Sequence, residues 1–382
     1  MKEYFYKKEY RYMYLAKVSY SFGNALIETF GTVMLYKNGI QIWLILLIYG
    51  LRFGITGICT PLFVTISAKI GIAKCVLLSN IFSIVSAYMM LDGSDIYRNI
   101  VIFILAMGLM GISNPSGDAL SSKYVDTEYR GRFNSFLGIS KIAGTAIASC
   151  LVAWGVVTEN NIILFSIIAI FFLLEYIFIR KIDYKVEDNT SAFKASMEYI
   201  LKSKSRYKII YAYRTNHIIE RQFVPLYLYV VLKDFQLFSS VIIVSLLLQI
   251  ITVALIGKYS DKNITKANQL VTIIKTIVTG VFLCTKNKVV ISLNKTLNDN
   301  FEKVYETSIQ TSIQNIIRES KENNELLSAV GQMSLCFTEV IVFSILAIMA
   351  TFMGKSVFYI IFVLSIVSTI AINLNIKRAS KK

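Results

Sequence analysis

The feature that most constrains this chain is a long succession of apolar segments. A helix that crosses a bilayer needs about 20 mainly apolar residues. Segments of this kind occupy 12–36, 41–66, 72–91, 99–121, 132–157, 161–180, 207–232, 237–257, 268–284, 289–317, 326–352 and 355–376. Hydrophobic residues make up 55% of the chain, above the roughly 45–50% of soluble domains. We therefore predict an all-α membrane protein with twelve transmembrane helices, of which 289–317 fits the pattern least.

The formal net charge of +16 is typical of nucleic-acid binders, but the positions of the basic residues indicate a membrane topology instead. With both termini in the cytoplasm, 26 Lys and Arg residues fall in inner segments and 6 in outer loops. The six are Lys37, Arg98, Lys233, Lys286, Lys288 and Lys355. Inner loops are the ones expected to carry the positive excess. We predict a multi-pass protein of the cell (plasma) membrane with both termini cytoplasmic and no nucleic-acid partner.

Metal, cofactor and enzyme chemistry find little support in the sequence. The five cysteines are scattered singly without metal-ligand spacing, and the chain has a single histidine, so no zinc-type site is expected. No phosphate-binding glycine-rich loop is present in the sequence, which argues against ATP use. We predict no metal, no cofactor, no catalytic residues and no enzyme activity.

A polar stretch near the middle of the chain separates two halves. In residues 181–206, the sequence SAFKASMEYILK places Phe193, Met197, Ile200 and Leu201 on one helical face, as in a helix that lies on a membrane surface. We predict a six-helix bundle at 1–180, a cytoplasmic linker with an amphipathic helix at 181–206, and a second six-helix bundle at 207–382.

The two halves contain similar short sequences at similar spacing. NALIE at 24–28 and NHIIE at 216–220 match at Asn24/Asn216 and Glu28/Glu220, an offset of 192 residues. Two basic turns, PLFVTISAKIGIAK at 61–74 and ALIGKYSDKNITK at 254–266, match at an offset of 193. Agreement between two distant matches indicates an internal repeat.

These turns carry a resemblance to the major facilitator superfamily of secondary transporters, and the resemblance covers nearly the whole chain. The family's loop between its second and third helices reads roughly G-x-x-x-D-[RK]-x-G-[RK]-[RK], and YVDTEYRGRFNSFLG at 124–138 is similar to its loop before the fifth helix. The matching positions are Lys69, Gly71, Lys74, Arg130, Arg132, Gly257, Asp261, Lys262 and Lys266. The pattern departs at Val64, Ala68 and Ile264, and the proline of many drug–proton antiporters is absent from the fifth segment.

The resemblance implies two six-helix bundles related by an axis along the membrane normal, with the substrate site near the midplane. The first, fourth, seventh and tenth segments would line that site. It further implies a secondary active transporter that works by alternating access. The charged residues inside the apolar segments indicate a small polar or charged solute and make coupling to protons possible. Members of the family commonly act as monomers, so we expect a monomer whose partners are its solute, a coupling proton and the lipid bilayer.

Charged residues inside apolar segments are the candidates for that site, because a charge that faces lipid is costly. Lys17, Ser21, Asn24 and Glu28 form one stripe of a helix. The candidate substrate- or proton-binding residues are Asn24, Glu28, Arg214, Asn216, His217, Glu220, Arg221, Asp299, Glu302 and Glu306. The alternative is structural: Lys17 reaches the cytoplasmic face, Glu28 forms an ion pair, and the 214–221 charges neutralise one another.

The segment 289–317 is amphipathic, with an apolar face that includes Val290, Leu293 and Leu297. Its other face carries Lys295, Asp299, Glu302, Glu306 and Gln310. Hydropathy alone favours a surface helix, whereas the twelve-helix layout favours a membrane helix whose polar side faces water. Lys295–Asp299 and Asp299–Lys303 are spaced to pair at i,i+4. The other intramembrane charges, which we expect to pair across helices, are Arg52, Lys141, Glu175, Lys275 and Glu339.

Two other functions stay open at this point. Multidrug or amphipathic-compound efflux would favour an aromatic cavity with few charges. A transporter-like receptor that no longer transports would hold its charges in self-satisfied ion pairs. Substrate identity and the direction of transport are not indicated by any motif.

Overall fold

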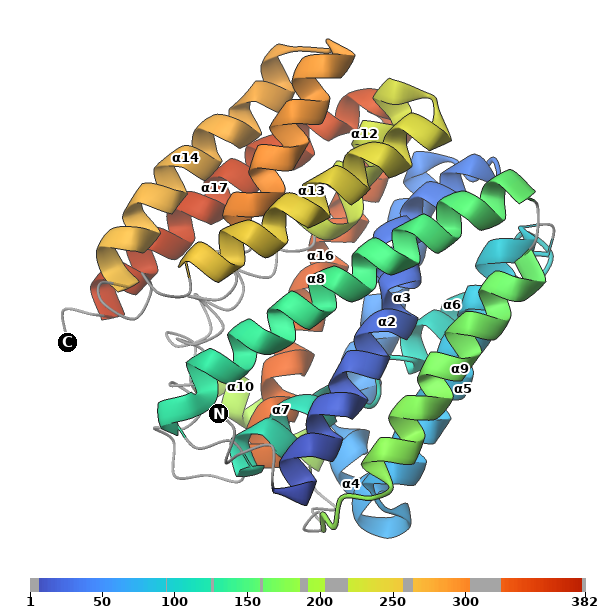
Figure 1. Ribbon diagram of the computed structural model, residues 1–382, viewed down its shortest axis with the longest axis vertical. Coiled ribbons are helices and arrows are strands. Elements are labelled where there is room, and N and C mark those ends of the chain that lie inside the picture. The colour runs from blue at the N-terminus through green and yellow to red at the C-terminus, as the bar shows by residue number, and fades with distance from the viewer. Residues whose placement is uncertain are drawn as a thin grey trace.

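The protein is described by a computed structural model that covers residues 7–93, 95–124, 127–158, 161–185, 192–202, 219–256, 264–302 and 324–379. Within these ranges every regular element is a helix. The long helices lie side by side, and α2 begins and α17 ends at the same end of the bundle (Figure 1). We call this the terminal end and the opposite one the distal end.

The first half of the chain follows the predicted segments closely, with two interruptions. Its helices are α2 (Lys8–Lys37), α3 (Ile42–Cys59), α4 (Leu62–Ile70), α5 (Ile72–Asp92), α6 (Ile100–Leu109), α7 (Asn114–Tyr124), α8 (Thr127–Thr158) and α9 (Asn161–Ile179). The predicted segment 41–66 divides at Thr60–Pro61 and the segment 99–121 divides before Pro115. Proline has no N–H to donate to the preceding turn, which explains both divisions. The predicted linker helix is present as α10 (Ala192–Lys202).

The second half is helical throughout its described ranges apart from short turns. Its elements are η1 (Ile219–Phe223), α12 (Val224–Leu232), α13 (Phe235–Ile256), α14 (Ile264–Cys284), the helical residues 288–302, α16 (Asn324–Met353), η2 (Gly354–Ser356) and α17 (Val357–Ala379). The π-helical η1 ends just before Pro225, which lies in the first turn of α12. A π-turn beside a proline leaves backbone carbonyls of that turn open to outside donors.

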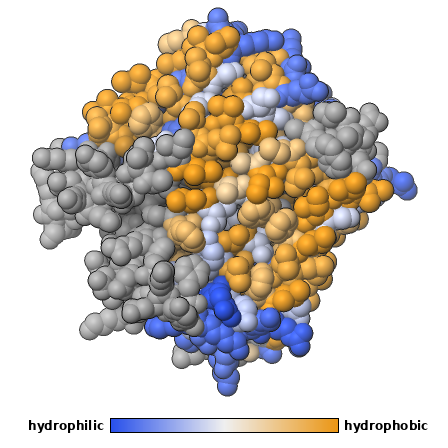
Figure 2. Space-filling model, viewed as in Figure 1, coloured by the Kyte–Doolittle hydropathy of each residue, from blue (hydrophilic) through white to orange (hydrophobic). Residues whose placement is uncertain are grey.

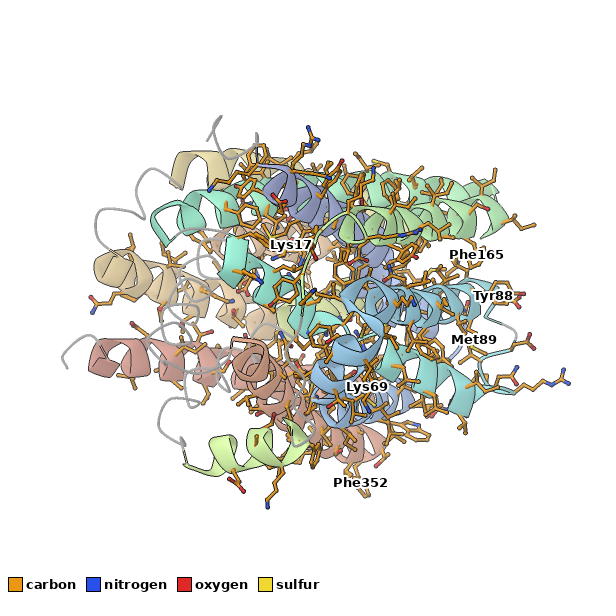
Figure 3. The ribbon with its side chains drawn as sticks, turned by 90° about the horizontal axis from the view of Figure 1, so that it is seen from below. Lys17, Lys69, Tyr88, Met89, Phe165 and Phe352 are labelled. Atoms are coloured by element: carbon orange, nitrogen blue, oxygen red, sulfur yellow. The ribbon has the colours of Figure 1, made fainter. Side chains whose placement is uncertain are left out.

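The surface of the bundle is apolar as expected for lipid contact. Among the described residues, five stretches are long and apolar enough to cross a membrane, namely Ile42–Cys59, Ile72–Asp92, Ile100–Ser121, Ile162–Ile179 and Ala329–Leu374, the last of which contains α16 and α17. Figure 2 shows a broad hydrophobic area across the visible face, with hydrophilic residues gathered at its top right and bottom edges. Phe352 is 86% exposed and projects from the bundle, whereas Lys17 lies among the helices (Figure 3). The chain is a multi-pass membrane protein, and twelve spans remain a prediction.

The two halves pack against each other along two helix pairs. On α3, Gly50, Gly54 and Gly57 face α16, where a Cβ on Gly57 would lie 3.0 Å from the Cys336 Cβ. Small residues at this spacing let two helices approach closely. On the other side, α8 lies beside α13 (Figure 1). Apolar side chains of both halves form one core toward the distal end, which includes Phe30 and Phe238.

The predicted basic-turn motif forms the connection between α4 and α5. Gly71 has a φ of 85°, a conformation that glycine adopts without steric cost, and Lys69 and Lys74 beside it are exposed. Arg130 and Arg132 belong to α8 and Lys266 to α14, where the structure describes the helix but not these side chains. The predicted motif residues Gly257, Asp261 and Lys262 lie outside the described residues. A role of these residues in conformational change stays a prediction.

Candidate functional site

The polar stripe predicted on the first segment lies inside the bundle. Lys17 of α2 donates a hydrogen bond to the Ser121 hydroxyl of α7 and lies 5.8 Å from the centre of the Phe133 ring. Asn24 is 3% exposed, and its Oδ1 has no hydrogen-bond partner. Lys17 is therefore held by a neighbouring helix, while Asn24 keeps an unused acceptor. Glu28 lies on the same helix, and its side chain is outside the described part of the structure.

Of the charged residues predicted at 214–221 in the seventh segment, the structure describes only those from 219 onward. Arg214, Asn216 and His217 lie outside the described residues, as does the side chain of Glu220. Glu220 and Arg221 belong to the π-helical turn η1, and Arg221 is half-buried. The candidate binding roles of Glu28 and Glu220, which match in the two halves, therefore stay predictions.

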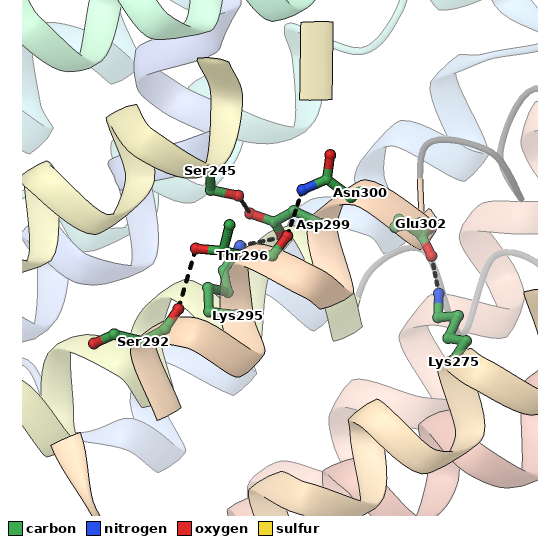
Figure 4. A network of polar contacts seen from close by, with 8 residues as sticks. All are labelled: Ser245, Lys275, Ser292, Lys295, Thr296, Asp299, Asn300 and Glu302. Carbon is green, nitrogen blue, oxygen red and sulfur yellow. Dashed lines mark hydrogen bonds and ion pairs between the residues drawn. The ribbon is translucent and has the colours of Figure 1, made fainter. Parts of the chain in front are cut away.

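The helical residues 288–302 carry the most complete polar network (Figure 4). Lys295 pairs with Asp299 within one helical turn, as the i,i+4 spacing predicts. The Ser245 hydroxyl of α13 donates to the other carboxylate oxygen of Asp299. Both oxygens of this carboxylate are thus engaged, one by a cation and one by a neighbouring helix.

Two further contacts attach this helix to its neighbours. The Thr252 hydroxyl of α13 donates to Asn300 Oδ1 over 2.6 Å, and Asn294 Nδ2 donates to the Val278 carbonyl of α14 over 2.8 Å. Glu302 forms an ion pair with Lys275 of α14, which is completely buried. Lys275 therefore pairs across helices, as expected from its place in an apolar segment. Glu306 lies outside the described residues.

The burial pattern of residues 288–302 is the reverse of that in a soluble protein. The charged Lys295 and Glu302 are 3% and 7% exposed, whereas Leu293 and Leu297 are 63% and 52% exposed. In water this arrangement would expose apolar surface and bury charge, both at a cost in free energy. A lipid environment reverses the first cost. The pattern favours the membrane alternative for this helix over the surface helix that hydropathy alone suggests.

The two halves contact each other at the distal end of the bundle. The Thr32 hydroxyl of α2 donates to the Gln222 backbone carbonyl in η1 over 2.8 Å. Phe30 meets Phe238 of α13 edge to face, with ring centres 5.8 Å apart. Tyr36 meets Tyr229 in the same manner at 6.2 Å. We call the contacts of Phe30, Thr32 and Tyr36 with the second half the distal seal.

Several of these residues escaped the sequence analysis. Ser245 and Thr252 are seven residues apart, so they lie on the same face of the helix. This spacing could have indicated a polar stripe in an otherwise apolar segment. Thr32 gives no such signal, because a single threonine in an apolar helix does not by itself indicate a polar contact. Among the described residues no group of three His, Cys, Asp or Glu side chains could hold a metal ion.

Comparison with known proteins identifies the family. The sequence profile of the Major Facilitator Superfamily matches residues 13–286, which is most of the chain. The chain therefore belongs to the Major Facilitator Superfamily, a family of secondary transporters, and the resemblance seen in the sequence is confirmed. No curated protein sequence matches the chain.

Two solved structures share this fold. Both are crystal structures of a bacterial homologue of the iron transporter ferroportin in the outward-facing state, one of them with soaked iron. The iron-soaked structure is 11% identical, with a TM-score of 0.66 over 97% of this chain and 99% of that one. The other is 11% identical, with a TM-score of 0.68 over 98% and 99%. At this identity the likeness shows the fold alone.

Proposed function

From membership of this family we propose that the protein moves a small polar or charged solute across the membrane by alternating access. The observation that carries the proposal is the network around Asp299, in which a partly buried carboxylate is held by Lys295 and by Ser245 of another helix. Intramembrane charges of this kind commonly mark solute or ion pathways. In this fold the tenth segment is one of those expected to line the site.

The distal seal supplies one gate of the proposed cycle. Its buried hydrogen bond between halves, from Thr32 to the Gln222 carbonyl, contributes on the order of 1 kcal/mol. The aromatic pairs beside it contribute roughly 0.5–1.5 kcal/mol each beyond their buried area. Contacts of this size are strong enough to hold one state and weak enough for a bound solute to shift the balance.

Proton coupling would use carboxylates within the apolar segments. Protonation of Asp299 would weaken its pairing with Lys295 and free the Ser245 hydroxyl, so binding of a proton and rearrangement of the site would be linked. Glu28, Glu220 and Glu306 are further candidates at positions predicted from the sequence.

The charged network supports a polar or charged solute over an amphipathic drug, since a drug cavity would place aromatic side chains where Lys295 and Asp299 lie. A receptor would show the same engagement of both carboxylate oxygens of Asp299, so a measurement of flux separates the receptor alternative from transport. The two solved structures of similar fold are of a homologue of an iron transporter. A solute screen of this chain should therefore include divalent cations.

The test is a proteoliposome assay with an imposed pH gradient and pooled metabolites, amino acids, organic acids and divalent cations. We expect gradient-driven flux in the wild-type protein that is lost in Asp299→Asn, Glu28→Gln or Glu220→Gln while the variants remain folded. Asp234→Asn is the matched control, because Asp234 is an exposed helix cap that accepts from the Leu237 N–H and asparagine caps equally well. No flux of any solute in the wild type would refute transport and leave the receptor alternative.

A further inference from the structure

Arg52 differs from the other cations inside the bundle. It lies in the middle of α3, is 9% exposed, and its Nε and Nη1 have no hydrogen-bond partner in the described structure. By contrast, Lys17 has Ser121, Lys275 has Glu302 and Lys295 has Asp299. The charged groups of these lysines are satisfied by the protein itself, and the guanidinium edge of Arg52 is not.

Aromatic rings contact Arg52 without using its N–H groups. The guanidinium carbon lies 5.5 Å from the centre of the Tyr49 ring and 5.0 Å from that of Phe53. Such cation–π contacts engage the face or charge of the guanidinium, whereas its hydrogen bonds point outward from the edge in a planar fork. Burying a charge with donors unmade is costly, so a cation in this position is expected to serve a partner that arrives from outside.

The side of α3 that bears Arg52 belongs to the interior of the bundle. Gly50, Gly54 and Gly57 occupy the side packed against α16, and Leu51 is exposed on the outer side. The Arg52 backbone and Thr56 lie against α6, where Thr56 donates to the Gly108 carbonyl. Tyr49, one turn away from Arg52, reaches α2 and α16.

Asn24 lies on α2, the helix that meets Tyr49 of α3 at Gly31. It lies midway between Lys17, which contacts α7, and Gly31, where an added Cβ would lie 2.7 Å from the Tyr49 hydroxyl. Spacings of seven residues keep all three on one side of a helix. A helix rises 1.5 Å per residue, so Asn24 lies about 10 Å from Gly31 toward the terminal end. Because α3 runs antiparallel to α2, Arg52 lies about 5 Å from Tyr49 in the same direction.

We propose that Arg52 and Asn24 bind the oxyanion of the transported solute, a carboxylate or a phosphate. The Arg52 fork would donate two parallel hydrogen bonds to two oxygens of that group, the geometry for which arginine is suited and lysine is not. Asn24 would donate through Nδ2 to a further oxygen, and its unused Oδ1 would accept from a hydroxyl or ammonium of the same solute. This inference rests on the proposed transport function and specifies the class of solute as anionic.

The first test compares the unliganded proteins in lipid nanodiscs. Arg52→Gln removes an uncompensated buried charge, so its melting temperature is expected to equal or exceed that of the wild type. Lys286→Gln, which removes a charge from an exposed loop, is the matched control and should melt like the wild type. A marked loss of stability in Arg52→Gln alone would overturn the proposal, because it would show that the arginine already has a partner within the protein.

The second test measures binding of acetate, succinate, glutamate, inorganic phosphate and glycerol phosphate, with succinamide and chloride as controls. An anion that binds the wild type should bind Arg52→Gln about 10- to 100-fold more weakly, the equivalent of one or two charged hydrogen bonds. Arg52→Lys should restore only part of the affinity, and Asn24→Ala should weaken binding less than Arg52→Gln does. Carboxylate-only or phosphate-only binding would identify the source of the oxyanion.

Failure of this inference can be told apart from failure of transport. If no anion in the panel binds, or if Arg52→Gln binds as tightly as the wild type, the oxyanion site is refuted even where flux of another solute is found. If anions bind through Arg52 but no flux occurs in proteoliposomes, the binding site stands and the transport proposal falls.

Discussion

Breaking the ion pair between Lys275 and Glu302 should destabilise the protein more than any surface change. Lys275 has no exposed surface, and Glu302 is 7% exposed. Replacing Glu302 by Gln leaves a buried ammonium opposite a neutral amide. Loss of one partner of a buried pair costs about 3–5 kcal/mol, and the amide oxygen keeps one acceptor, so we expect a loss of about 3 kcal/mol in the free energy of unfolding.

A double-mutant cycle separates this pairing from other effects of the substitutions. Unfolding of the wild type, Glu302→Gln, Lys275→Met and the double variant would be followed in detergent by denaturant titration. The double variant should be more stable than Glu302→Gln, with a coupling of roughly 1–3 kcal/mol, because neither charge of the pair is then present. Strictly additive losses would refute the reasoning and would mean that residues 288–302 do not pack on α14 through this pair. Lys286→Gln again serves as the surface control.

Three further predictions test separate contacts. Gly57→Cys should form a disulfide with Cys336 under mild oxidation, because the Cβ atoms would be 3.0 Å apart and a shift of about 0.5 Å between the helices brings them to the usual separation of about 3.5–4.5 Å; an absence of cross-linking would contradict the α3–α16 packing. Thr32→Val should remove the hydrogen bond of the distal seal and raise amide exchange in η1 and α12 about fivefold, the equivalent of about 1 kcal/mol, whereas Thr32→Ser should not. Leu293→Cys, although 63% exposed, should react with a water-soluble thiol reagent far more slowly in nanodiscs than Lys286→Cys, since lipid would cover it.

The positions of helices were well predicted where an apolar run ends at a strong local signal. The predicted segment 72–91 corresponds to α5 at Ile72–Asp92, and 161–180 corresponds to α9 at Asn161–Ile179. Gly71 marks the first of these boundaries through its positive φ. The division of 41–66 at Pro61 was missed, because the hydropathy of this segment continues unchanged through the break. A helix end is predictable where the apolar run itself ends. An interruption inside an apolar run depends on a single residue such as Pro61, which hydropathy does not detect.

The candidate site was predictable only within single helices. Lys295 and Asp299 are four residues apart, so their pairing follows from helical geometry and is confirmed. Ser245 reaches the same carboxylate across 54 residues of sequence, and no periodicity in α13 specifies which neighbour its polar face meets. The same limit applies to Lys275, whose need for a partner was predictable and whose choice of Glu302 was not.

The helical residues 288–302 show why average hydropathy underestimates a membrane helix of this kind. Lys295 and Asp299 alone would oppose insertion of an isolated helix by roughly 5–7 kcal/mol at the membrane centre, and Glu302 would add to that. Their partners outside this helix, Ser245 and Lys275, both precede it in the chain. During synthesis α13 and α14 therefore emerge first and can offer these polar groups before residues 288–302 enter the membrane. We therefore expect the helix to be stable in lipid through its contacts with α13 and α14, which the hydropathy of a single segment does not include.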